Sequence, residues 1–292
     1  MTKLKGMPPK EAKQRKPKML IFGVAGIGKT FNSLDFPNVY YIDTEGGATL
    51  SNYTDKLANS GGVYLGIDQG SNDFKTILEQ IDALTTEKHS FKTLVIDSIT
   101  KVFNDEIATE AERLEKANKK NEFGTDKKPA VNFMKRLVNK LNKLDMNVIV
   151  VCHEKSKWVK GEQEGFTYDC WDKLGHELDL VMQIIKQGNS RKAKVVKSRY
   201  ECFNDGDTID WSYPNFAELY GKDIIEQESK PLELATTEQL EQLGKIIDVV
   251  KPPQEQIDKF FKKAKCDSWQ GMEKDLMQKC IEYFLKQTES LK

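Results

Sequence analysis

The sequence predicts an α/β protein with a mainly parallel sheet and flanking helices, followed by a small helical module. Between residue 18 and about residue 220, short runs rich in Val, Ile and Leu alternate with stretches of helical periodicity. Continuous apolar strands separated by helices are typical of a parallel sheet covered on both faces. Apolar residues make up 38% of the 292 residues, which is enough to bury a sizeable core.

The individual elements follow from local pattern. Strands are expected at the apolar runs 19–22, 39–42, 63–67, 93–96, 147–151, 178–185 and 193–196. Helices are expected over 73–84, 101–115 and 130–144, where apolar residues recur at helical spacing. Because only residues 187–192 separate the last two runs, these are predicted to pair as a hairpin.

Four regions are expected along the chain. They are a basic flexible arm (1–17), the α/β domain (18–225), a linker (226–236) and a helical module (237–292). Thr237 is the expected N-cap of the first module helix, and Pro252-Pro253 should end that helix. The arm's composition leaves two roles open, contact with nucleic acid and simple solubilisation.

Charge and cysteine usage exclude several classes of protein. Forty-five Lys and Arg balance 45 Asp and Glu, so net charge identifies no partner. The apolar runs are too short to span a bilayer, and no apolar stretch follows the basic N-terminus as in a secretory signal. Five cysteines without a CxxC pair favour a reduced, cytoplasmic protein and exclude a disulfide scaffold.

A phosphate-binding motif lies directly after the first expected strand. The residues match GxxxxGK[ST], the Walker A pattern, and comprise Gly23, Val24, Ala25, Gly26, Ile27, Gly28, Lys29 and Thr30, with Phe31 next to them. Glycines let successive backbone N–H groups surround phosphate oxygens, Lys29 can reach the β- and γ-phosphates, and the Thr30 hydroxyl can ligate Mg²⁺. The sequence therefore predicts ATP and Mg²⁺ as cofactors.

Two carboxylates complete the expected site. Asp97 ends the strand over 93–96 and is the second Mg²⁺ group, although a helix-capping role for it stays open. Ser98 follows Asp97, so the water-activating base must lie elsewhere. Glu45, at the turn after the strand over 39–42, is the candidate base; a solvated turn carboxylate is the alternative.

These residues carry a resemblance to the RecA-type recombinase ATPases. Residues 23–30, the turn over 43–47 and the strand over 94–98 match that family in order and spacing. The resemblance implies that Glu45 is the catalytic base and that His153 senses the γ-phosphate. Cys-His-Glu stands at 152–154, where the recombinases usually have Asn-Gln, and a structural role for His153 stays open.

The same resemblance implies an oligomer, either a ring or a filament. The segment over 193–199 resembles the family's strand with two cations that reach a neighbouring subunit, which implies that Lys197 and Arg199 act in trans. Charge protecting a sheet edge is the alternative. The compact chain most resembles the short phage RecA-like proteins of the Sak group, which implies single-strand annealing and recombination.

Two expected loops are candidates for binding single-stranded DNA. In the family, two loops at these places line the DNA channel, and cations interleaved with aromatic rings suit single strands. The candidates are Lys119, Lys120, Lys127 and Lys128 in the first loop (116–129) and Lys155, Lys157, Trp158 and Lys160 in the second (154–173). Polar surface loops are the alternative, and a single-strand-binding protein is a further candidate partner.

Three functions are compatible with this pattern. The first is a DNA-stimulated ATPase of recombination, encoded by a phage and working in the cytoplasm of its bacterial host. The second is an annealing scaffold whose assembly is gated by nucleotide binding alone. The third is a small-molecule kinase, which the scarcity of Arg in any expected lid segment disfavours.

Overall fold

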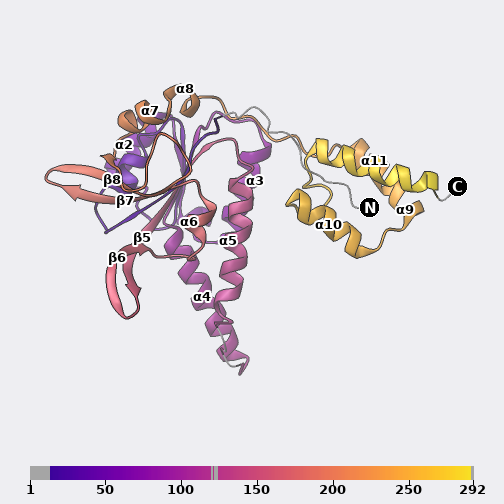
Figure 1. Ribbon diagram of the computed structural model, residues 1–292, viewed down its shortest axis with the longest axis horizontal. Helices are drawn as coiled ribbons and strands as arrows, with labels where there is room; N and C mark the ends of the chain where they lie inside the picture. The colour runs from indigo at the N-terminus through magenta and orange to yellow at the C-terminus, as the bar shows by residue number, and fades with distance from the viewer. Residues whose placement is uncertain (1–13, 120, 122–123, 291–292) are drawn as a thin grey trace. The chain divides into compact units, whose positions relative to one another are not determined.

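The computed structural model describes residues 14–119, 121 and 124–290 (Figure 1). The chain forms two compact units. One comprises the described residues up to Phe74 with Ser90–Met134 and Met146–Glu228, and the other comprises Lys75–His89, Lys135–Asp145 and the described residues from Ser229 onward. The basic arm expected over residues 1–17 falls mostly on residues 1–13, which lie outside the described residues. The domain boundaries inferred from the sequence stay a prediction.

A large, mostly parallel sheet organises the first unit and confirms the predicted fold class. Its strand order is β3-β2-β4-β5-β1-β7-β8-β9, parallel from β3 to β7 and antiparallel beyond, and β6 pairs with β5. The strands are β1 Lys18–Gly23, β2 Val39–Asp43, β3 Val63–Leu65, β4 Thr93–Asp97, β5 Asn147–Val159, β6 Glu162–Tyr168, β7 Leu180–Gln187, β8 Ser190–Ser198 and β9 Thr208–Asp210. One strand, β5, therefore separates β1 from β4.

Helices connect the strands. They are α1 Lys29–Ser33, α2 Ser51–Ser60, α3 Phe74–Thr86, α4 Ile99–Lys116, α5 Lys127–Leu141, α6 Leu174–Glu177, α7 Tyr213–Tyr220 and α8 Lys222–Ile225, with a 3₁₀ turn over Ile67–Gln69. The three helices expected between strands correspond to α3, α4 and α5. The expected β7–β8 hairpin is also confirmed.

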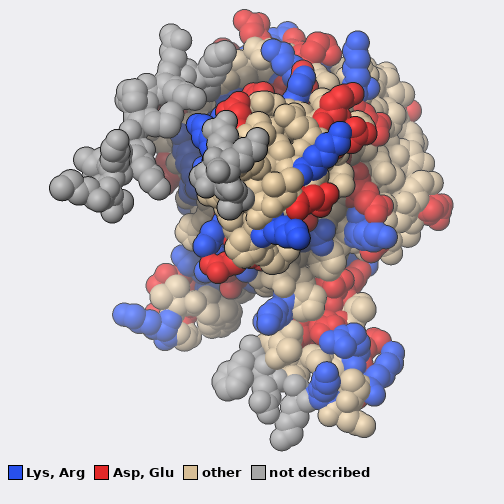
Figure 2. Space-filling model, turned by 90° about the vertical axis from the view of Figure 1, so that its right-hand side faces the viewer, with Lys and Arg blue, Asp and Glu red and all other residues tan. Residues whose placement is uncertain are grey.

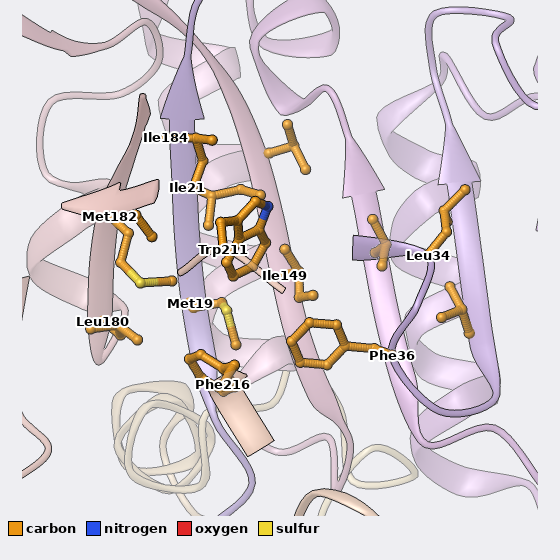
Figure 3. Packing of buried hydrophobic residues seen from close by; sticks show 14 of the residues in the cluster. Met19, Ile21, Leu34, Phe36, Ile149, Leu180, Met182, Ile184, Trp211 and Phe216 are labelled. Atoms are coloured by element: carbon orange, nitrogen blue, oxygen red, sulfur yellow. The ribbon is translucent and has the colours of Figure 1, made fainter. Parts of the chain in front are cut away.

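The alternation of side chains along β1 and β5 builds the core on one face of the sheet. Met19, Ile21 and Ile149 point to the same side and pack with Trp211 and Phe216 (Figure 3). All five side chains are buried, and burial of an apolar side chain of this size contributes about 1.5–3 kcal/mol. This packing holds β1, and with it the phosphate loop, in a rigid frame.

The sequence pattern did not predict the regular structure of residues 154–173. Where a loop was expected, β5 runs on to Val159 and β6 returns antiparallel to it, so the segment is mainly a β-hairpin. Lys160 and Gly161 at its turn both have positive φ, 52° and 88°, as in the two-residue turns that join such strands. Lys127 and Lys128, expected in a loop, lie in the first turn of α5.

The C-terminal residues form the three helices that were expected: α9 Thr237–Val250, α10 Gln254–Ala264 and α11 Lys274–Ser290. The N-cap is Thr236 and not Thr237, because the Thr236 hydroxyl accepts from the Gln239 N–H while the Gln239 side chain accepts from Thr236. The three helices share a core of their own. No helix among the described residues has both the length and the apolar character needed to cross a membrane.

Candidate nucleotide and catalytic site

Strand register brings the predicted site residues to one edge of the sheet. Gly23 pairs with His153 across β1 and β5, and Asp43 pairs with Asp97 across β2 and β4. Both pairs stand at the carboxyl ends of parallel strands, which is where ligands bind in open α/β sheets. Segments more than 100 residues apart in the chain therefore meet at one edge.

The phosphate loop depends on its glycines. A Cβ on Gly23 would lie 2.5 Å from the carbonyl oxygen of Ile184, so the close packing of β1 on β7 allows no side chain there. Gly28 has φ 96°, in the left-handed region that favours glycine. These two positions shape the loop between β1 and α1.

Lys29 folds back onto this loop. Its buried Nζ donates to the carbonyl oxygens of Gly23 (2.8 Å) and Val24 (2.9 Å). Burial lowers the pKa of Lys29, and the negative charges of Asp97 and Glu45 oppose that effect. A bound phosphate would give the ammonium group a stronger partner than two neutral carbonyls.

A cavity of about 510 Å³ opens beside the loop. Its lining includes two cationic side chains, Lys29 and Arg191, and no carboxylate. The remaining wall is polar or aromatic, and the full lining is Gly26, Gly28, Lys29, Thr30, Phe31, Asn32, Asn52, Tyr53, Asn189 and Arg191. Such a lining suits an anionic ligand.

Thr30 and Asp97 are in direct contact. The Thr30 hydroxyl donates to Asp97 Oδ2, and burial raises the pKa of Asp97 to about 6, with Glu45 adding to the effect while Thr30 and Lys29 oppose it. Two adjacent oxygens, one of them on a nearly buried carboxylate, match the donor preference of Mg²⁺. These residues fit the metal that the sequence predicts.

Asp43 builds the turn that carries Glu45. Asp43 is buried, and its Oδ1 accepts from the backbone N–H groups of Glu45 (3.1 Å) and Gly46 (3.0 Å) while Oδ2 accepts from that of Ala48 (2.7 Å). Thr44 adds a link to the end of β4, since its N–H donates to the Asp97 carbonyl at 2.8 Å. Glu45 is thus positioned by a fixed turn beside Asp97.

Glu45 contacts His153 and Ser98. Its Oε1 lies 2.5 Å from His153 Nε2 and accepts from the Ser98 hydroxyl at 2.6 Å. The Ser98 oxygen is also 3.2 Å from His153 Nε2. Glu45 and His153 keep 41% and 48% of their side chains exposed, so both are open to a ligand and to water at this edge.

Lys197 and Arg199, the two cations expected to act on a neighbouring subunit, do not lie at the strand ends that form the site. They lie near the opposite ends of the parallel strands. Lys197 pairs with Val181, which pairs with Leu20 near the start of β1. The Lys197 ammonium donates to the Leu178 carbonyl, and Arg199 forms an ion pair with Asp179 at 3.0 Å. This position keeps both away from the phosphate loop of their own chain, and their action on a neighbour stays a prediction.

The candidate DNA residues lie in two places. Lys119 is exposed just after α4, Lys127 and Lys128 are exposed in the first turn of α5, and Lys120 lies outside the described residues. Lys155, Lys157, Trp158 and Lys160 all lie on the β5–β6 hairpin, which projects from the sheet in Figure 1. Figure 2 shows Lys and Arg interspersed with Asp and Glu on one face of the molecule.

Asp43, Ser98 and Arg191 are among the residues of the site that were not predicted. Ser98 stands next to Asp97 and Asp43 stands two residues before Glu45, and the strand-end position of Asp43 was a usable signal. Arg191 follows the β7–β8 turn with no local motif, so only the folded structure places it beside Gly28.

Comparisons with known proteins identify a domain family. The profile of an AAA domain family matches residues 15–206. Among solved structures, the RadB recombinase resembles the chain at 20% identity and a TM-score of 0.43, over 66% of this chain and 86% of that one. A search of curated proteins found no match.

Proposed function

The chain belongs to the AAA domain family, whose phosphate-loop members bind nucleotides, typically with Mg²⁺, and hydrolyse them. From this premise we propose that the protein is an Mg²⁺-dependent ATPase that binds single-stranded DNA and promotes annealing and recombination as an oligomer. One observation carries the proposed ATPase activity. Glu45, Asp97 and Lys29 lie close together at the carboxyl ends of the parallel strands, beside a cavity whose lining, among the described residues, holds cations and no carboxylate.

The proposed hydrolysis assigns one task to each residue. Lys29 leaves the loop carbonyls to neutralise the triphosphate, while Thr30 and Asp97 hold Mg²⁺, which when bound would stabilise charge on the phosphate oxygens. Glu45 accepts a proton from the attacking water. Because Ser98 and His153 both contact Glu45 Oε1, Glu45 Oε2 is the oxygen available for that proton. In this proposal His153 senses the γ-phosphate.

ATPase assays of two variants test this assignment. Glu45→Gln keeps the side-chain shape and should lower kcat by about 100- to 10,000-fold, the usual contribution of a general base, while ATP binding persists. Lys29→Ala should abolish both binding and turnover. Glu218→Gln, an exposed change on α7, is the matched control, and wild-type turnover in Glu45→Gln would refute the base assignment.

Single-strand binding is proposed for the β5–β6 hairpin. Ser156 pairs with Phe166 and Trp158 pairs with Gln163, and the strand register shifts between these two pairs. Trp158 and Phe166 therefore lie a few residues apart on adjacent strands of the hairpin, with Lys155 and Lys157 on the same strand as Trp158. Trp158 is 64% exposed and Phe166 is 51% exposed. Exposed rings with cations beside them suit base stacking with phosphate contacts.

Fluorescence anisotropy with labelled oligo(dT) tests the hairpin. Trp158→Ala should weaken binding by about 5- to 150-fold, since stacking contributes about 1–3 kcal/mol per base. Val196→Ala removes an exposed apolar side chain from β8 and serves as the control. Equal affinities of Trp158→Ala and the wild type would remove the hairpin from the proposal.

The same variants separate hydrolysis from nucleotide gating. If hydrolysis drives annealing, Glu45→Gln should lose annealing along with turnover. Retained annealing in Glu45→Gln with loss in Lys29→Ala would instead identify a scaffold gated by nucleotide binding.

A further inference from the structure

Arg191 is a cation beside the phosphate loop, and no acidic side chain among the described residues pairs with it. It stands at the start of β8, next to the β7–β8 turn, and its guanidinium donates to the Asn189 carbonyl at 3.4 Å. Within the described part of the chain it forms no ion pair, whereas Lys192 next to it pairs with Asp210 at 2.7 Å. Its charge is therefore available to a ligand.

The Arg191 side chain lies against the backbone of Gly28. A Cβ on Gly28 would be 3.6 Å from Arg191 Nε and 3.7–3.8 Å from the side-chain carbons Cγ and Cδ. Arg191 also lines the cavity beside the loop together with Lys29. Since alternate residues of a strand share a face, Arg191 points to the same side as the buried Ala193.

The backbone of Arg191 is tied to α1 through Trp211. The Trp211 N–H donates to the Arg191 carbonyl at 2.9 Å, and the Trp211 carbonyl accepts from the Asn32 side chain. Trp211 is 1% exposed, so this link is held by the core. The backbone that carries the guanidinium is thus positioned relative to the loop before any ligand arrives.

From this geometry we infer that Arg191 is a phosphate-binding residue of the same subunit, the second cation after Lys29 to contact the polyphosphate of the nucleotide. The inference rests on the proposed nucleotide site and adds a contact from β8. An acid-free cavity with two cations favours an anion, and the planar guanidinium can donate two parallel hydrogen bonds to phosphate oxygens. The contact assigned to Arg191 is therefore with the polyphosphate and not with the base.

Calorimetric titration with MgATP and with inorganic tripolyphosphate tests this inference. Arg191→Met keeps an aliphatic side chain against Gly28 and removes the charge. It should lower the affinity for both ligands by at least about tenfold, since a hydrogen bond to a charged group contributes about 1.5–3 kcal/mol. Arg191→Lys should recover part of the affinity. Lys194→Met, on the other face of the same strand, should bind like the wild type.

The outcomes distinguish this inference from the proposed function. Failure of the wild-type protein to bind either ligand would overturn the nucleotide site itself. Wild-type binding with equal affinity in Arg191→Met would overturn only the role of Arg191. Weaker MgATP binding with unchanged tripolyphosphate binding would assign the guanidinium to the nucleoside and would also overturn the phosphate contact. Unchanged melting temperatures show that all three variants are folded.

Discussion

Replacing Asp43 should disturb stability and catalysis together, because this buried carboxylate accepts three backbone N–H groups of the turn that carries Glu45. A hydrogen bond to a charged acceptor contributes about 1.5–3 kcal/mol. The N–H groups of Glu45 and Gly46 belong to exposed residues and can turn to water, whereas Ala48 is buried. We therefore expect Asp43→Ala to lower the free energy of unfolding by about 2–4 kcal/mol.

Urea unfolding followed by tryptophan fluorescence measures this loss. At a slope of about 2 kcal/mol per molar urea, the midpoint of the unit that contains Asp43 should fall by about 1–2 M. Asp43→Asn should lower the free energy of unfolding by less than Asp43→Ala does. One of its side-chain atoms is still an accepting oxygen, although its NH₂ group would face a backbone donor. Asp223→Ala, an exposed change on α8, is the control.

The kinetic effect should accompany the loss of stability. A turn displaced by about 1 Å moves Glu45 away from the attacking water, and kcat should fall by about 10- to 100-fold while the affinity for ATP changes little. If Asp43→Ala kept both the wild-type urea midpoint and the wild-type kcat, the turn would not depend on this carboxylate and the positioning argument would be wrong.

Three further predictions concern the loop, the serine and the metal. Gly23→Ala should lower thermal stability by about 1–3 kcal/mol, because its Cβ would lie 2.5 Å from the Ile184 carbonyl oxygen; an unchanged calorimetric melting temperature would contradict this. Ser98→Ala should lower kcat by about 3- to 30-fold, the loss of one hydrogen bond to Glu45, with unchanged ATP affinity and partial recovery in Ser98→Thr. Chelation of divalent ions with EDTA should abolish turnover, and added Mg²⁺ should restore it; full activity in EDTA would exclude metal-assisted hydrolysis.

Local sequence pattern was sufficient to predict the central strands of the sheet. The apolar runs of β1, β2, β4 and the start of β5 are buried on both faces, so their composition alone identified them, and the GxxxxGK[ST] spacing located the phosphate loop. The short elements α2, α6, α7, α8 and β9 were missed, since segments of about ten residues or fewer carry too little periodicity to stand out. The β5–β6 hairpin was missed because its polar strands lie mostly in solvent and lack an apolar face.

The sequence by itself thus determined the class of fold, the position of the phosphate-loop motif and the candidate carboxylates, because each depends on residues close together in the chain. Only the tertiary structure decided which distant groups meet. Strand pairing brings His153 into contact with Glu45, 108 residues away in the chain. It places Lys197 and Arg199 near the opposite ends of the parallel strands, and it brings Arg191 next to Gly28. Such contacts depend on the order and pairing of strands, which local pattern does not encode.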